Sequence, residues 1–213
     1  IFQMGIDIPY EQYISSEKMY SKFTIQGQEI KQGVFNGETL WSTNFMSGKA
    51  EKNDQEAVKK ARNQLKDFPD PFFNYKEKGF TAKYMGTEIL EGSEVHKIRL
   101  TKTPNIIDGK EIPNIFNYFF DAENYMIIMR HQELTEGPSK GAIMETRMSD
   151  FRKVDGLYLP FSITQGVKDQ PSQTFTIKSY EINAIIDENE FEFPETKADD
   201  TPKGSKNTNG TIY

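Results

Sequence analysis

An antiparallel hairpin is encoded most plainly in the run Phe151-Arg152-Lys153-Val154-Asp155-Gly156-Leu157-Tyr158-Leu159-Pro160-Phe161-Ser162-Ile163. The second half of this run places an apolar side chain at every other position, which is typical of a strand with one buried face. The central Asp-Gly pair tolerates positive φ and is therefore typical of a tight hairpin turn. The run predicts two neighbouring antiparallel strands.

The same period of two recurs along the chain, in residues 2–8, 19–25, 96–100 and 144–148. Gln26-Gly27 and Asn36-Gly37 supply further turn signals between strand-like runs. Consecutive hairpins predict an antiparallel meander, so the expected fold class is mainly β.

One helix interrupts this pattern. Asn53 and Glu56 form a plausible capping pair, and Ala57, Ala61 and Leu65 follow at helical spacing. The run Phe68-Pro69-Asp70-Pro71 is expected to end the helix. We therefore expect one domain over residues 1–194 and a polar tail over residues 195–213.

Composition excludes several functions. The 213 residues include 26 Lys and Arg against 32 Asp and Glu, which argues against a nucleic-acid partner. The absence of cysteine excludes disulfides, thiolate metal sites and cysteine nucleophiles. No apolar run reaches the roughly 18–20 residues that a membrane-spanning helix needs.

Signals for catalysis are sparse. His96 and His131 both lie at strand-face positions, where a packed histidine is the simpler interpretation. Asp121 and Glu123 flank an expected turn, where carboxylates are usually solvated. No glycine-rich phosphate loop and no Gly-x-Ser-x-Gly motif occurs. We expect no enzymatic activity, no catalytic residues, no metal and no cofactor.

The methionine content leaves two interpretations open. The chain has 8 Met, and Met4, Met129, Met144 and Met148 fall on the apolar side of expected strands. Methionine suits surfaces that accommodate variable apolar ligands, but it also fills irregular cores.

Several motifs occur in an order that resembles one known family. They are Asn36-Gly37-Glu38-Thr39-Leu40-Trp41-Ser42-Thr43-Asn44, Asp70-Pro71-Phe72-Phe73-Asn74-Tyr75, Gly86-Thr87-Glu88, Phe120-Asp121-Ala122-Glu123-Asn124-Tyr125, Asp150-Phe151 through Pro160-Phe161, and Phe191-Glu192-Phe193-Pro194. Together they resemble the LolA-like carriers of outer-membrane lipoproteins, over nearly all of residues 2–194.

The resemblance implies an unclosed antiparallel β-barrel, or half-barrel, around an apolar cavity, with residues 53–78 as a helical lid. It also implies a periplasmic carrier that binds lipoprotein acyl chains or free lipid. Membrane-associated donor or acceptor proteins are further expected partners, and the carrier is expected to be a monomer. The alternative is a periplasmic sensor or regulatory module that uses the same half-barrel to detect lipoproteins and bind a membrane partner. A hydrolase is a third interpretation, which no constellation of residues supports.

Two departures from the family pattern limit what the resemblance implies. Ser15 and Ser16 occupy the position of the Arg-Pro pair whose arginine secures the lid in family carriers. The family's N-terminal helix has no counterpart, so we expect a further segment to precede Ile1. The arginine-dependent latch is therefore not carried over to this chain.

Strand parity predicts the residues that line the acyl cavity. They are Phe2, Met4, Phe23, Ile25, Trp41, Ile127, Met129, Met144, Met148, Phe161 and Ile163, with Phe68, Phe72 and Phe73 contributed by the lid. Trp41, the sole tryptophan, is expected either beside the cavity or as a core anchor next to its hairpin. In the first case its emission would shift when a lipopeptide binds.

Overall fold

The computed structural model describes residues 2–3 and 6–194. Met4 and the predicted polar tail, 195–213, lie outside the described residues, and so does the side chain of Phe2. The strands are β1 (Phe2–Gln3), β2 (Ile6–Asp7), β3 (Tyr10–Ile14), β4 (Met19–Ile25), β5 (Gln28–Phe35), β6 (Leu40–Thr43), β7 (Ala50–Lys52), β8 (Thr81–Leu90), β9 (Ser93–Ile107), β10 (Lys110–Asp121), β11 (Ile127–Glu133), β12 (Ile143–Val154), β13 (Leu157–Val167) and β14 (Gln173–Thr176). The helices are α1 (Gln55–Leu65) and the short 3₁₀ helix η1 (Glu188–Phe191).

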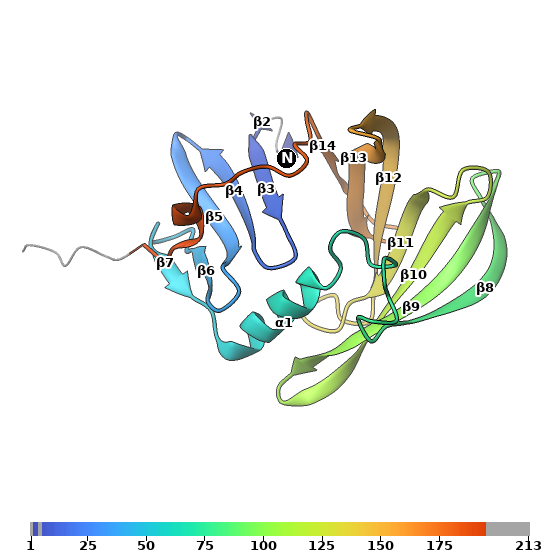
Figure 1. Ribbon diagram of the computed structural model, residues 1–213, viewed down its shortest axis with the longest axis horizontal. Helices are drawn as coiled ribbons and strands as arrows, with labels where there is room; N and C mark the ends of the chain where they lie inside the picture. The colour runs from blue at the N-terminus through green and yellow to red at the C-terminus, as the bar shows by residue number, and fades with distance from the viewer. Residues whose placement is uncertain (1, 4–5, 195–213) are drawn as a thin grey trace, which may run out of the picture.

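Two antiparallel meanders form the body of the protein. Strands β3 to β7 make a five-stranded sheet, and β8 to β14 make a seven-stranded sheet, each in chain order, while β1 and β2 form a separate pair. The two large sheets stand side by side without closing into a barrel, and α1 crosses from one toward the other (Figure 1). The prediction of a mainly β, unclosed antiparallel fold with one helical insertion is confirmed.

The predicted hairpins differ in how they turn. Asp155 and Gly156 have φ values of 46° and 90°, so they form the expected two-residue turn between β12 and β13. The Asn36-Gly37 hairpin instead has a four-residue connection. There the Asn36 side-chain oxygen accepts hydrogen bonds from the backbone N–H groups of Glu38 and Thr39, at 3.0 and 2.8 Å. Asn36 therefore stabilises this turn through the hydrogen bonds of its side chain.

Helix α1 covers one face of the five-stranded sheet. Its N-cap is Asp54, one residue after the expected Asn53, and the Asp54 carboxylate accepts a hydrogen bond from the Ala57 N–H at 2.8 Å. Its apolar side packs into a cluster formed by Val58, Ala61, Leu65, Met19, Phe35 and Leu40.

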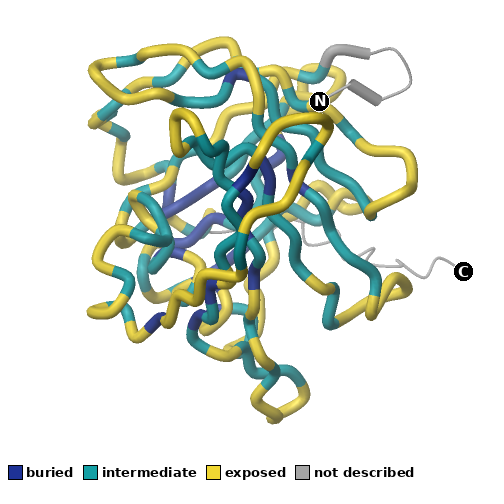
Figure 2. Tube along the Cα trace, turned by 90° about the vertical axis from the view of Figure 1, so that its right-hand side faces the viewer, coloured by how far each residue is buried: buried dark blue, intermediate teal, exposed yellow. Residues whose placement is uncertain are grey.

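The last described residues, 177–194, cover the opposite face of that sheet, and we call them the C-terminal arm. The arm leaves β14 of the seven-stranded sheet and runs back to the five-stranded sheet, where η1 lies (Figure 1). Phe191 is 3% exposed and packs with Tyr20, Val34 and Trp41. The five-stranded sheet therefore has a packing partner on each face, and buried segments lie in the interior of the trace (Figure 2).

Candidate functional site

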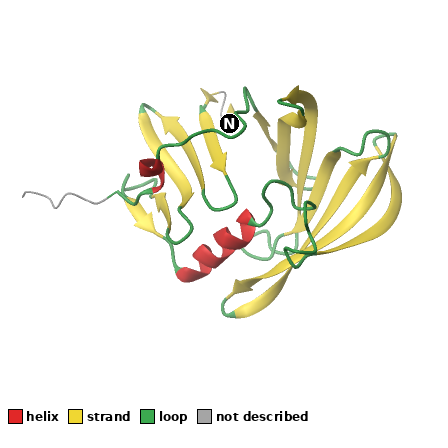
Figure 3. Ribbon diagram, in the orientation of Figure 1, coloured by secondary structure: helices red, strands yellow, loops and turns green. Residues whose placement is uncertain are grey.

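Each large sheet turns one face toward α1 and residues 66–80, and we call these the inner faces (Figure 3). On the five-stranded sheet, α1 covers only the part around Phe35. The rest of this inner face carries large apolar side chains that stay partly exposed: Tyr10 at 43%, Ile14 at 39% and Ile25 at 38%. Phe45 stacks on Phe23 with ring centroids 5.6 Å apart and extends the same surface.

The seven-stranded sheet has a similar inner face. Phe72 and Tyr75, from the segment after α1, pack against β9 and β10 in a cluster with Phe80, Leu100, Phe116 and Tyr118. On β12 and β13, Met144, Met148 and Ile163 turn to the same face and are only half-buried. The apolar inner surface therefore extends beyond the area that the insertion covers.

A buried ion pair joins the insertion to the seven-stranded sheet. Lys102 Nζ lies 2.5 Å from Asp67 Oδ2, and the Lys102 side chain is 4% exposed. The ammonium also lies 4.0 Å from the centre of the Phe116 ring, within cation–π range. Burial lowers the pKa of Lys102, although Asp67 counteracts part of this effect. Sequence reasoning missed this lysine, even though it continues the alternating series of His96, Ile98 and Leu100.

The structure divides the predicted cavity residues between two faces. The inner faces carry Phe23, Ile25, Ile127, Met144, Met148, Phe161 and Ile163. Trp41 and Met129 lie on outer faces, in separate buried clusters. Of the three phenylalanines predicted to belong to a lid, Phe72 packs on the sheet, whereas Phe68 is 36% exposed and Phe73 is 58% exposed.

A β-bulge explains the position of Met129. Ile127 pairs with Phe120, but Met129 pairs with Phe119, so one extra residue lies between the two pairs. The two side chains therefore turn to opposite faces of the sheet, although their sequence spacing predicts one face. Met129 is 2% exposed and packs with Val95 and Phe119.

Trp41 is held by the C-terminal arm on the outer face of the five-stranded sheet. Its Nε1–H donates a hydrogen bond to the Phe191 carbonyl oxygen at 3.2 Å, and its ring meets that of Phe193 edge-on at 6.0 Å. Only 3% of Trp41 is exposed. Trp41 therefore does not lie beside the inner apolar surface. Its surroundings are those of a core anchor next to its hairpin.

This placement changes what tryptophan fluorescence is expected to report. Because Trp41 lies across the sheet from the inner face, its emission is expected to stay unchanged when a lipopeptide displaces an apolar dye from the protein. Phe191→Ala, which loosens the arm over Trp41, is expected to shift the emission to the red without ligand. An emission change that follows dye displacement in the wild type would place the ligand near Trp41 instead.

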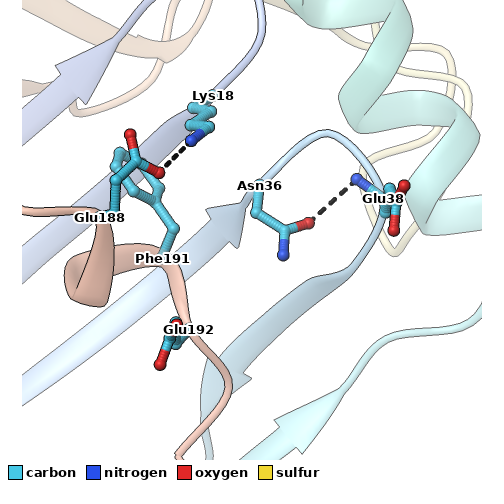
Figure 4. A pocket seen from close by; sticks show the side chains of 6 residues that line it. All are labelled: Lys18, Asn36, Glu38, Glu188, Phe191 and Glu192. Atoms are coloured by element: carbon cyan, nitrogen blue, oxygen red, sulfur yellow. Dashed lines mark hydrogen bonds and ion pairs between the residues drawn. The ribbon is translucent and has the colours of Figure 1, made fainter.

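A shallow hollow lies beside the C-terminal arm, outside the five-stranded sheet (Figure 4). Its lining is mostly polar and includes Lys18, Asn36 and Glu188. Lys18 and Glu188 form an ion pair with each other, and the Asn36 side chain accepts hydrogen bonds within its own turn. Lys18, Asn36 and Glu188 therefore already have partners within the protein, and the other charged groups of the lining, Glu38 and Glu192, are both acidic.

The histidines take part in packing. The His96 ring stacks on Tyr125 at 6.0 Å, and its Nδ1 lies 3.2 Å from the Tyr84 hydroxyl. His131 Nε2 lies 2.7 Å from Glu145 Oε2 on the outer face of the seven-stranded sheet. Within residues 2–3 and 6–194, no three His, Asp or Glu side chains are grouped so that they could hold a metal ion.

The outer-face carboxylate of Glu145 predicts a loss of stability in acid. Burial alone would raise the pKa of Glu145, but hydrogen bonds from Arg147 and His131 outweigh it, and the pKa lies below its usual value. The unfolded chain therefore binds the proton more tightly than the folded protein does. The stabilisation that the ionised Glu145 provides is present above pH about 4.3 and is lost as the pH falls through the lowered pKa. Glu145→Gln is expected to lower the free energy of unfolding at pH 7 by about 1 kcal/mol.

The measurement is urea unfolding between pH 7 and pH 3, where Glu145→Gln is expected to show a shallower loss of stability than the wild type. Glu88→Gln is a matched control, because it removes an exposed ion pair with Lys97 and is expected to cost less than about 0.5 kcal/mol. Equal pH profiles for the wild type and Glu145→Gln would contradict the prediction.

Comparisons with known proteins bear on the fold. No family model and no curated protein matches the sequence. The crystal structure of an outer membrane lipoprotein-sorting protein domain from Vibrio parahaemolyticus is similar, with a TM-score of 0.51 at 9% identity, over 86% of this chain and 80% of that chain. A LolA superfamily protein from Nitrosomonas europaea gives a TM-score of 0.47 at 11% identity, over 82% and 79%.

No helix within the described residues is long and apolar enough to cross a membrane. The similarity to the structure from Vibrio parahaemolyticus covers most of both chains, so it concerns the fold as a whole. The chain therefore has the fold of a lipoprotein-sorting domain, and the LolA-like fold predicted from its motifs is confirmed.

Proposed function

We propose that this protein is a periplasmic carrier that binds acyl chains of lipids or lipoproteins on the inner faces of its two sheets. The observation that carries the proposal is the apolar inner surface beyond α1 and residues 66–80. Tyr10, Ile14 and Ile25 on one sheet, and Met144, Met148 and Ile163 on the other, remain partly exposed there. Exposed apolar surface of this kind marks an interaction site.

Burial of acyl chains supplies enough free energy for such a carrier without any chemical step. Each methylene removed from water contributes about 0.8 kcal/mol, so eight methylenes contribute roughly 6 kcal/mol before the costs of association. The methionines favour this role, because a flexible thioether side chain adapts to chains of different shape. Transfer to or from membrane-associated donor or acceptor proteins would follow from the same role, with the protein acting as a monomer.

Solvent extraction of the purified protein, followed by mass spectrometry, tests the proposal. We expect acyl lipid or an acylated peptide to be recovered with the protein, and a protein stripped of lipid to take up an apolar dye that a lipopeptide displaces. Stripped protein that binds neither dye nor lipopeptide, while keeping its native circular dichroism, would rule the carrier role out.

A further inference from the structure

The apolar inner face of the seven-stranded sheet contains an unusual group of charges. Lys102 is almost fully buried, and Asp67 of the segment after α1 is its only ion-pair partner among the described residues. A buried charge is costly unless it is fully paired and hydrogen-bonded. The other carboxylate oxygen of Asp67, Oδ1, is also buried and has no hydrogen-bond partner within the described residues. The pair is therefore incompletely satisfied on its anionic side.

A second cation lies on the same face without a counter-ion. Arg130 pairs across the strands with Tyr118, and its guanidinium carbon lies 5.8 Å from the centre of the Phe116 ring. Lys102 lies over that same ring, so both cations flank Phe116. Within the described part of the chain, Arg130 forms no salt bridge.

Tyr118 adds an unused donor to this group. The residue is 2% exposed, its buried hydroxyl donates to no acceptor among the described residues, and the Arg130 guanidinium interacts with it. Burial raises the pKa of Tyr118, so the hydroxyl remains protonated and able to donate. Lys102, Arg130 and the Tyr118 hydroxyl lie closest to Asp67, while Asp70 acts on Lys102 and Tyr118 more weakly. Two cations beside a hydroxyl donor suit an anionic oxygen group.

This group is continuous with the apolar surface. Thr146 of β12 pairs with Arg130, and Met144 and Met148 lie two residues to either side of Thr146 on the same face. A head group held by Lys102 and Arg130 would therefore leave its acyl chain beside these two methionines.

We propose that Lys102, Arg130 and the Tyr118 hydroxyl form a head-group subsite for an anionic amphiphile, a carboxylate or phosphate attached to an acyl chain. Asp67 is the internal counter-ion that occupies the subsite when no ligand is bound. The inference rests on the proposed function and narrows it, since it selects acidic lipids over neutral ones.

Competition between Asp67 and the ligand gives the subsite a distinctive response to substitution. Removing a cation weakens binding of the anionic ligand, whereas removing the internal carboxylate strengthens it. A purely apolar site shows neither effect, because neutral chains gain nothing from either charge.

Isothermal titration calorimetry on the whole, lipid-stripped protein tests the inference with four probes: dodecyl phosphate, laurate, dodecanol and inorganic phosphate. The two anionic amphiphiles are expected to bind about tenfold or more tightly than dodecanol, the size expected for one charge-assisted hydrogen bond. Inorganic phosphate is expected to bind much more weakly than dodecyl phosphate, since it lacks the chain.

Two variants and one control locate the effect. Arg130→Gln is expected to remove most of the preference for dodecyl phosphate over dodecanol, and Asp67→Asn is expected to raise the affinity for dodecyl phosphate several-fold. Arg99→Gln is the matched control, because Arg99 lies on the outer face of the same sheet and donates to Asn117. It is expected to leave all four affinities unchanged.

The outcomes separate this inference from the proposed function. Equal affinity of the wild type for dodecanol and dodecyl phosphate would overturn the subsite and leave the carrier role standing. Binding of inorganic phosphate as tight as that of dodecyl phosphate would overturn it too, because the site would then recognise a free anion. Failure of every amphiphile to bind would overturn both.

Discussion

Phe35→Ala is expected to lower the free energy of unfolding by about 3–5 kcal/mol, the range for removing a buried aromatic ring. Phe35 is 1% exposed and lies at the centre of the contact between α1 and the five-stranded sheet. Because Val58, Ala61 and Leu65 of α1 all belong to this cluster, the cavity would loosen the helix as well as the sheet. Urea unfolding, followed by circular dichroism, measures the change.

Phe35→Leu is the matched control, because it keeps most of the apolar volume and is expected to cost about 1 kcal/mol. Hydrogen exchange gives an independent readout, with faster exchange expected in α1 for the alanine variant. If alanine and leucine were equally tolerated, the packing of α1 on this sheet would be wrong.

Met148→Glu is expected to reduce acyl-ligand affinity by about a hundredfold or more, with the fold retained. Met148 is half-buried on the inner face, so a carboxylate there would face the bound chain. Placing a charge against apolar atoms without a partner costs several kcal/mol, and about 2.7 kcal/mol already corresponds to a hundredfold loss. Dye displacement by a lipopeptide measures the change.

Ser149→Glu provides the control for charge alone. Ser149 follows Met148 on the same strand, is exposed and turns to the outer face. It is expected to bind the lipopeptide as the wild type does. If Met148→Glu folds and still binds normally, the inner face of β12 does not contact the ligand.

Local patterns predict the elements of this protein well. Strand alternation and turn residues locate the hairpins at Gln26-Gly27, Asn36-Gly37 and Asp155-Gly156, and helical spacing locates α1. These signals succeed because each depends on a few neighbouring residues. Gly86 shows a first limit: a glycine within a strand-like run is typical of a break or a bulge, and here it lies at a bulge within the continuous strand β8.

The face of the sheet to which each side chain points is harder to predict. The bulge between Ile127 and Met129 reverses the parity of the rest of β11, including His131, and nothing in the local sequence marks it. Trp41 and Phe23 both lie on strands of the same sheet, yet they turn to opposite faces, because both faces of this sheet carry apolar side chains. An alternating pattern reveals one buried face but does not identify which partner buries it.

The candidate head-group subsite escaped sequence reasoning for a related reason. Lys102 and Asp67 are 35 positions apart, and each follows a polar residue, so neither stands out from an ordinary surface residue. Only the packing of the segment after α1 on β9 brings them together.

The C-terminal arm has a consequence for how this chain folds. The Trp41 side chain and the Phe191 carbonyl that it contacts are separated by 150 positions, so the outer core of the first sheet is completed by nearly the last described residues. During synthesis, the side chains of Tyr20, Val34 and Trp41 would remain exposed to water until the C-terminal arm leaves the ribosome. Such high contact order slows folding and prolongs exposure to aggregation. The outer face of the first sheet is therefore completed only once residues 177–194 are available to cover it.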